Sequence, residues 1–255
     1  MIKLLILFLI ILFSQKSALT RDAGETEITT EDGIEVFQEE KYYLLKKNVE
    51  ILSDELKLNG QIVKIYFEEG LYDIKELIAN DNVSFISEQY NIEGKGNTVK
   101  FNIKDQKIYV NGIKSELYLE KTKMFSDGKI DVDNLKGLFS INGPNSSLIS
   151  DNIYIVGSKI NGSFEIINGK RDIANLVVED EEKLNINTDD IIMFSKKAIF
   201  NKKKSIIELF ENVEINRGNE TITGDYGILN TNKNSYKVSS TNSNKVKAII
   251  LSADE

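Results

Sequence analysis

The segment LFENVEINRGNETITGDYGILNTNKNSYKV, residues 209–238, contains an Asn-Val pair and, eleven residues after the valine, a glycine. The same arrangement occurs in KKNVEILSDELKLNG and in NDNVSFISEQYNIEG. The valine and glycine positions are Val49 and Gly60, Val83 and Gly94, and Val213 and Gly224. Three segments with one spacing indicate a structural repeat, which is the first feature to establish in an unknown chain.

Apolar side chains recur at fixed offsets from these valines and glycines. They stand two residues after the valine, two before the glycine, and five and fourteen after it. The positions are Ile51, Phe85 and Ile215; Leu58, Ile92 and Ile222; Ile65, Val99 and Leu229; and Ile74, Ile108 and Val238. We expect one apolar stripe that faces a common interior.

The glycines of the repeat predict a backbone requirement. Glycine is favoured where the chain turns with positive φ or where two strands approach closely. We therefore expect Gly60, Gly94 and Gly224 to be structural, and Gly94→Val to destabilise the fold more than Gly96→Ala.

Local alternation decides between a helical array and a β-structure. The 34-residue separation of the first two copies fits helical repeats of the tetratricopeptide type. However, Thr98–Ile103 and Lys107–Val110 alternate with a period of two and are rich in β-branched and aromatic residues. Tyr42–Leu58 and Tyr72–Asn80 are ambiguous alone, but they align with strands in other copies. The chain is predicted to be all-β, with short antiparallel strands in strand-turn-strand repeats.

Asn-Gly and Asp-Gly pairs are typical of tight hairpin turns. They occur at 32–33, 59–60, 111–112, 127–128, 142–143, 161–162 and 168–169. We expect each pair to end a strand and begin a hairpin.

Composition narrows the function classes. The 255 residues include no histidine, cysteine or tryptophan, and the formal net charge is −8. The absence of cysteine excludes disulfides, thiol nucleophiles and thiolate zinc sites, and the absence of histidine removes the commonest general base. An acidic chain also disfavours nucleic-acid binding. We expect no catalytic residues, no metal, no cofactor and no enzyme activity, and we interpret the acidic run 179–182 as a solvated loop.

The amino end has the layout of a secretory signal peptide. Lys3 precedes the apolar block Leu4–Phe13, and small residues follow. Ten apolar residues are fewer than the roughly 17–25 that span a bilayer as a helix. We expect residues 1–20 to direct export to the periplasm, with cleavage near residues 17–20; an uncleaved anchor is the alternative.

Several segments together resemble the OstA-like domain of periplasmic lipopolysaccharide-transport proteins of the LptA type. The resemblance rests on Asn-Val-x-apolar, on Thr221–Tyr226 and on the hairpin that ends Tyr236–Val238. It also includes the lead-in hairpins Gly33–Val49 and Asp189–Val213 and the terminal strand Lys245–Ile250. The family usually has glycine directly before Asn-Val, whereas this chain has Lys47, Asp81 and Glu211.

The resemblance implies a domain division. It covers 28–113 and 189–250, so residues 21–113 are assigned to one OstA-like β-repeat region and 189–255 to another that carries the terminal strand. Residues 114–188 are assigned to a less regular β region, either a second lobe or a continuation.

The resemblance also implies a fold and a function. The fold is a twisted, half-open antiparallel β-jellyroll around an apolar groove. The function is a periplasmic bridge component that binds lipopolysaccharide and shields lipid A acyl chains during transport to the outer membrane. The implied partners are other jellyroll subunits at the inner and outer membranes, joined end to end by strand pairing, and further copies of this chain.

Three hypotheses remain open from the sequence. The first is the lipid-shielding bridge, in which the apolar stripe stays partly open and binds acyl chains. The second is a structural β-repeat surface or adhesion protein, in which the same stripe is a closed core. The third is a secreted carboxylate-based polysaccharide hydrolase, for which no acid pair is singled out. Periodicity cannot separate the first two, because both need the same alternation.

Overall fold

The computed structural model describes residues 24–69, 73–241 and 245–251. These residues form a single 20-stranded sheet in which every pairing is antiparallel, and they contain no helix. The predicted all-β class is therefore confirmed, and Tyr42–Leu52 and Ile74–Asn80, within the segments that were ambiguous, lie in strands. No helix that could cross a membrane is found within these residues. The predicted signal peptide, 1–20, lies outside them.

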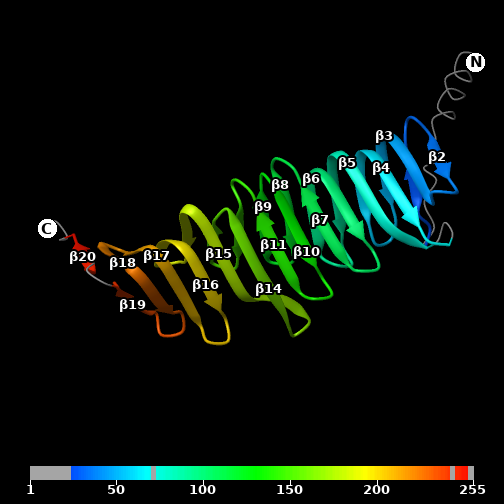
Figure 1. Cartoon of the computed structure of the whole chain (residues 1–255). Coiled ribbons are helices and arrows are strands. Elements are labelled where there is room, and N and C mark those ends of the chain that lie inside the picture. Colours follow the sequence, from blue (N-terminus) through cyan, green and yellow to red (C-terminus); the bar gives the residue numbers. More distant parts are fainter. Residues whose placement is uncertain (1–23, 70–72, 242–244, 252–255) are drawn as a thin grey trace, which may run out of the picture.

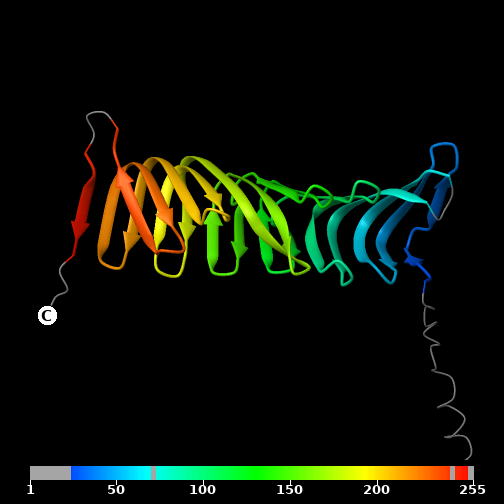
Figure 2. The ribbon, with the colours of Figure 1, turned by 90° about the horizontal axis from the view of Figure 1, so that it is seen from below.

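The strands lie across the long axis of an elongated body, with the first strands at one end and the last at the other (Figures 1 and 2). They are β1 (Glu27–Thr29), β2 (Ile34–Phe37), β3 (Tyr42–Leu52), β4 (Lys57–Phe67), β5 (Ile74–Ser87), β6 (Ile92–Asn102), β7 (Lys107–Asn111), β8 (Ser115–Leu119), β9 (Thr122–Ser126), β10 (Lys129–Asp133), β11 (Leu138–Asn142), β12 (Ser147–Ser150), β13 (Ile153–Val156), β14 (Lys159–Ile167), β15 (Lys170–Asn187), β16 (Ile192–Asn201), β17 (Ile206–Arg217), β18 (Glu220–Asn230), β19 (Ser235–Ser239) and β20 (Lys247–Ile250).

The sheet is folded along its length into two half-sheets that face each other. Half-sheet 1 follows the order β2, β3, β4, β5, β6, β7, β10, β11, β14, β15, β16, β17, β18, β19. Half-sheet 2 follows the order β1, β3, β4, β5, β6, β8, β9, β12, β13, β15, β16, β17, β18, β20. Long strands contribute one end to each half-sheet and bend between them, and we call this line of bends the corner. The arrangement is the predicted twisted, half-open antiparallel β-jellyroll.

The Asn-Val repeat forms the corner in three of the long strands. In each copy the asparagine and the residue before it both have positive φ. The pairs are Lys47 (φ 61°) and Asn48 (φ 47°), Asp81 (φ 64°) and Asn82 (φ 54°), and Glu211 (φ 63°) and Asn212 (φ 54°). The register shifts at each pair, which is the signature of a β-bulge, and a bulge bends the strand. The following valine then points into the interior and is buried.

The left-handed conformation explains why glycine suits the residue before Asn-Val. Residues other than glycine are strained at φ near +60° by roughly 1–2 kcal/mol, and asparagine and aspartate are strained less than the others. We expect Asp81→Gly to stabilise the fold by about 0.5–1 kcal/mol, less than the strain because glycine loses more backbone entropy. Urea unfolding measures the change.

Ser84→Gly is the matched control for that substitution. Ser84 is an exposed residue of the same strand, and its φ is not positive. Glycine there should destabilise by about 0.5–1 kcal/mol. If Asp81→Gly destabilised the fold as Ser84→Gly does, the bend at Asp81 would carry no strain.

The Asn-Gly and Asp-Gly pairs at 111–112, 127–128 and 142–143 are wrong as hairpin predictions. They connect β7 to β8, β9 to β10, and β11 to β12, and in each case the two strands lie in different half-sheets. They turn the corner, and their backbones bond to one another, as from Gly112 N to Gly128 O at 2.9 Å. Of the remaining pairs, 32–33 precedes β2, 59–60 and 161–162 lie inside strands, and only 168–169 closes a hairpin. A corner and a tight hairpin both favour left-handed residues, so the dipeptide does not distinguish them.

The second copy of the repeat differs in register from the other two. Val49 pairs with Gly60 and Val213 with Gly224, but Val83 pairs with Gly96, while Gly94 pairs with Phe85. The cause is the length of the hairpin beyond the valine. Val83 is four residues from the end of β5, before a turn of four residues, whereas Val49 is only three from the end of β3, and Val213 is followed by a turn of only two residues. The spacing of eleven therefore marks a register pair in only two copies.

Residues 114–188 contain β8 to β15. These strands continue both half-sheets without interruption, since β8 pairs with β6 and β15 pairs with β16. From β8 to β14 their corner is made of turns between short strands, which explains why the Asn-Val signal is missing there; in β15 the corner is a register shift between Glu179 and Leu184.

Candidate binding interior and its mouth

The interior between the half-sheets is lined by apolar side chains from nearly every strand. Among the residues of the predicted stripe, all but Ile74, Ile222 and Val238 are buried. Ile222 and Val238 are half-buried, and Val238 packs against the core. Ile74 is 39% exposed because it is the first residue of β5, at the rim of the half-sheet.

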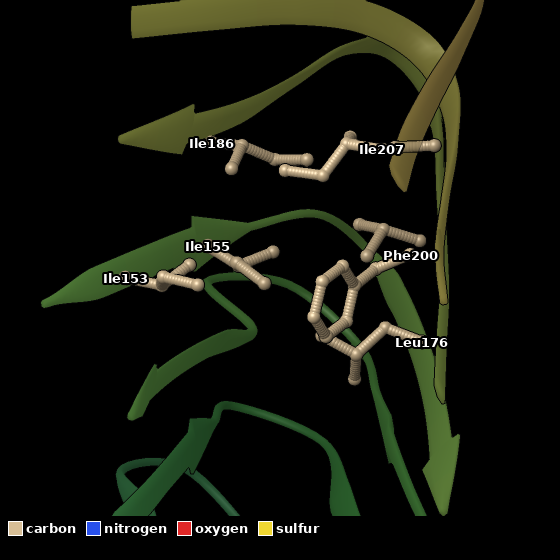
Figure 3. Close-up of a pocket in the computed structure, with 8 residues that line it drawn as sticks. Ile153, Ile155, Leu176, Ile186, Phe200 and Ile207 are labelled. Atoms are coloured by element: carbon tan, nitrogen blue, oxygen red, sulfur yellow. The ribbon is translucent and has the colours of Figure 1, made fainter. Parts of the chain in front are cut away.

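The apolar interior is filled. The buried side chains form one continuous cluster that runs from Leu45 in β3 to Leu229 in β18. One apolar cavity of about 20 Å³ lies between the half-sheets, lined by Ile153, Ile155, Leu176, Val178, Ile186, Ala198, Phe200 and Ile207 (Figure 3). That is room for about one water molecule, whereas sites for small organic ligands measure roughly 300–1,000 Å³. A long acyl chain can enter only if the half-sheets move apart or side chains change rotamer.

The side of the molecule opposite the corner has no strand pairing between the half-sheets, and we call it the mouth. Two rows of turns border it. The row of half-sheet 1 contains the turns 38–41, 103–106, 134–137, 168–169, 202–205 and 231–234. The row of half-sheet 2 contains the turns 53–56, 88–91, 120–121, 151–152, 188–191 and 218–219. Among the described residues, each contact that holds the mouth closed involves at least one side chain.

Contacts across the mouth occur at three places along the described chain. Phe85 of half-sheet 2 meets Phe101 of half-sheet 1 edge to face, with ring centroids 4.8 Å apart. Towards the C-terminal end, the Tyr236 hydroxyl in β19 donates a hydrogen bond of 2.6 Å to Glu220 at the start of β18. Burial and this carboxylate raise the pKa of Tyr236 above its usual value.

The third contact, at mid-length, is ionic. Arg171 at the start of β15 donates from Nη1 to Glu120 Oε1 at 3.0 Å, and Glu120 lies in the turn between β8 and β9. Next to it, Lys121 lies 3.6 Å from Asp172. Burial alone would raise the pKa of Asp172, but Lys202 and Lys121 outweigh it and leave that pKa lowered. Sequence reasoning did not single out these residues, because 51 positions separate Glu120 from Arg171 and no periodic pattern joins them.

Buried hydroxyl groups in the interior stabilise the corner. Ser126 donates to the Asn142 carbonyl, lies 2.9 Å from the Ser146 hydroxyl, and accepts from Gly128 N. Ser115 donates to the Gly112 carbonyl. These serines therefore serve as caps of the corner turns, and within the part of the chain that the structure describes no carboxylate or lysine is hydrogen-bonded to them.

The acidic run 179–182 also belongs to the corner. The register of β15 shifts between Glu179 and Leu184, and Asp180 accepts backbone N–H bonds from Ser158, Glu182 and Lys183. Burial would raise the pKa of Asp180, but the backbone donors outweigh it and lower that pKa. Within the described residues, no group of three or more acidic side chains is arranged as a metal site.

The fold and its interior define a class of protein: an elongated antiparallel β-jellyroll with an apolar interior bordered by an unpaired mouth. No family model matches the sequence, and no curated protein matches it. Among solved structures, the chain is similar to the crystal structure of LptH, "the LptA homologous periplasmic component of the conserved lipopolysaccharide transport device from Pseudomonas aeruginosa". The TM-score is 0.44 at 9% identity, and the match covers 51% of this chain and 95% of that one. At this level of similarity nothing about ligands or partners follows from the match.

Proposed function

We propose that this chain is a non-enzymatic, exported bridge component that shields the acyl chains of lipopolysaccharide in its interior. The observation that carries the proposal is the apolar interior, which runs along the sheet from end to end and is bordered by a mouth without strand pairing between the described residues of the two half-sheets. Shielding matters because each CH₂ group exposed to water costs about 0.8 kcal/mol. A polar head could remain in solvent at the mouth while the acyl chains lie inside.

The ends of the sheet support a role as one member of a longer assembly. β1 and β2 at one end, and β19 and β20 at the other, each have one edge without a strand partner among the described residues. Exposed apolar side chains lie on these terminal strands: Ile34 and Val36 on β2, and Ile249 and Ile250 on β20. Free edges of this kind accept a strand from another chain. The proposed partners are jellyroll subunits at the two membranes and further copies of this chain, in the periplasm.

Photo-crosslinking tests the shielding role. Ile65, Val99 and Leu229 are buried in the interior, at 4%, 0% and 3% exposure. A photo-reactive residue at each position should crosslink to lipopolysaccharide when the transport pathway is active. A melting curve of each variant shows that it remains folded.

The matched control positions are adjacent residues on the same strands: Lys64 before Ile65, Lys100 after Val99 and Ile228 before Leu229. They are not buried, and adjacent residues of a strand point to opposite faces. Probes there should give no lipid adduct. Equal crosslinking from both faces, or none from the interior in a folded and active system, would rule out the lipid-shielding role.

A second candidate is a structural β-repeat protein with a closed core, and the packed interior favours it. Leu45, Leu58, Leu117 and Leu148 are all at 0% exposure, as in an ordinary core. Native mass spectrometry after mild extraction distinguishes the two functions. A bound glycolipid supports the bridge, and its consistent absence supports the structural protein.

A further inference from the structure

The hairpin between β14 and β15, at mid-length of the molecule (Figure 1), extends beyond the half-sheet that contains it. β11 pairs with β14 only as far as Ser163, and β16 pairs with β15 only from Asn175 onward. Between these limits β14 and β15 pair only with each other, after a register shift at Ser163 and Phe164. We call residues 164–173 the strap.

The strap reaches across the mouth and bonds to half-sheet 2. Arg171 donates to Glu120 twice, from its backbone N to Oε2 and from Nη1 to Oε1, both at 3.0 Å. Its Nη2 also donates to Asn134 Oδ1 at 2.7 Å, so the two bonds from Nη1 and Nη2 fix the orientation of the guanidinium. The side chains of Arg171 and Glu120 are 16% and 18% exposed, and this is the most buried ion pair within the described residues.

A second ionic row lies on the other face of the strap. Asp172 contacts both Lys121 of half-sheet 2 and Lys202 of half-sheet 1. Lys121 in turn lies 2.6 Å from Asp151, in the turn between β12 and β13. Lys202 also lies 3.8 Å from Glu165 of the strap. The strap is therefore held to both borders of the mouth by charged side chains.

The base of the strap covers the apolar interior. Phe164 packs against Phe139 with the ring centroids 4.6 Å apart and the ring planes tilted by 34°, and Ile173 is 6% exposed. The strap thus closes the mouth at one level, between the strands of the N-terminal part and those that line the cavity of Figure 3.

We propose that the strap is a gate across the mouth, which a lipid must open to pass from one half of the interior to the other. The proposal rests on the proposed function. A lipid with its acyl chains inside and its polar head outside has to carry that head through the mouth, and the strap crosses the line of travel. The strap can move because its far side is fastened by ion pairs and by one bond from the Arg171 backbone N to the Glu120 side chain, with no strand pairing to half-sheet 2 among the described residues.

Distance measurements between spin labels test the gate. The chain has no native cysteine, so Lys123→Cys on β9 and Lys170→Cys on the strap, both exposed residues, give one label pair across the mouth. The full chain is measured alone and after addition of purified short-core lipopolysaccharide. We expect one short distance without lipid and a longer one when lipid is bound.

Arg171→Ala should release the strap. The labelled variant should show the longer distance even without lipid, and it should take up lipopolysaccharide about fivefold faster, as expected for the loss of one half-buried ion pair. Glu120→Gln retains the shape of the acceptor without its charge and should give a smaller change in the same direction. The matched control is Lys197→Ala, because Lys197 pairs with Glu179 at 2.8 Å within half-sheet 1 and does not cross the mouth.

Two outcomes overturn the proposal, and binding measured by native mass spectrometry separates them. If lipopolysaccharide binds but the label distance is unchanged and Arg171→Ala loads like the parent chain, the strap is a fixed brace and the proposed function stands. If no lipopolysaccharide binds to the parent or to Arg171→Ala, the proposed function fails and the gate fails with it. Far-UV circular dichroism confirms that each variant is folded.

Discussion

Val99→Asp should destabilise the chain by about 4 kcal/mol at pH 7, the scale for an unpaired charge buried in a core. Val99 is at 0% exposure, and its strand partners Ala79 and Val110 are also fully buried. None of these partners can donate a hydrogen bond from its side chain, so the new carboxylate would lack compensation. Urea unfolding at several pH values measures the loss.

The pH dependence of that loss follows from the pKa of the new carboxyl. Burial raises it in the folded state above the unfolded value of about 4. At pH values above the pKa of the unfolded state, the carboxyl must take up a proton when the chain folds. The destabilisation therefore grows as the pH rises towards the pKa of the folded state. The loss in free energy of unfolding relative to the parent chain should therefore be smaller at pH 4 than at pH 7.

Val99→Ala is the matched control. It removes methyl groups and leaves a cavity without a charge, so it should cost about 2 kcal/mol with no added pH dependence. If Val99→Asp were as stable as Val99→Ala at pH 7, the interior at β6 would contain water, and the packed-core description would be wrong there.

Gly128→Ala should cost about 3 kcal/mol, the upper range for overpacking a rigid site. A Cβ on Gly128 would overlap the backbone oxygen of Asn142 and lie 2.9 Å from the Gly143 Cα. Both obstacles are backbone atoms, so no rotamer change relieves the clash. Gly128 also accepts a hydrogen bond from Gly112 N, and a shift of the turn would weaken this bond between neighbouring corner turns.

Gly60→Ala provides the comparison within the corner. A Cβ there meets its nearest atoms at 3.5 Å or more, in ordinary van der Waals contact, and Gly60 has no positive φ. The change should be within about 0.5 kcal/mol of neutral and could be stabilising through reduced freedom of the unfolded chain. Similar urea midpoints for Gly128→Ala and Gly60→Ala would show that the corner turn at Gly128 can shift to accommodate the added Cβ at little cost.

Alternation of side chains predicted much of the fold, because a strand with one buried face must place apolar residues at every second position. Ile51 and Leu58 illustrate this, since they form a strand pair and both are buried. Ile74 was predicted to face the interior, but it is exposed. It is the first residue of β5, where the alternation of side chains continues but the opposite half-sheet no longer covers them. Whether these interior residues bind lipid stays a prediction.

The sequence could not predict the corner or the mouth. Asn111-Gly112 has the residues of a hairpin, and only the position of the neighbouring strands determines that it turns between half-sheets. Glu120 and Arg171 are ordinary surface types, and their contact depends on how far two separate hairpins project. Features that depend on the placement of distant turns leave no local pattern.

Because the strands lie across the long axis, the number of strands determines the length of the body. Each added strand extends the body by the spacing between hydrogen-bonded strands, about 4.8 Å, whatever the length of that strand. A repeat of about 34 residues, the separation of Val49 and Val83, places one outgoing and one returning strand on each half-sheet. Insertion of such a repeat would therefore lengthen the body by about 10 Å without changing its cross-section. The distance that one copy can cover is set by how many repeats its gene encodes.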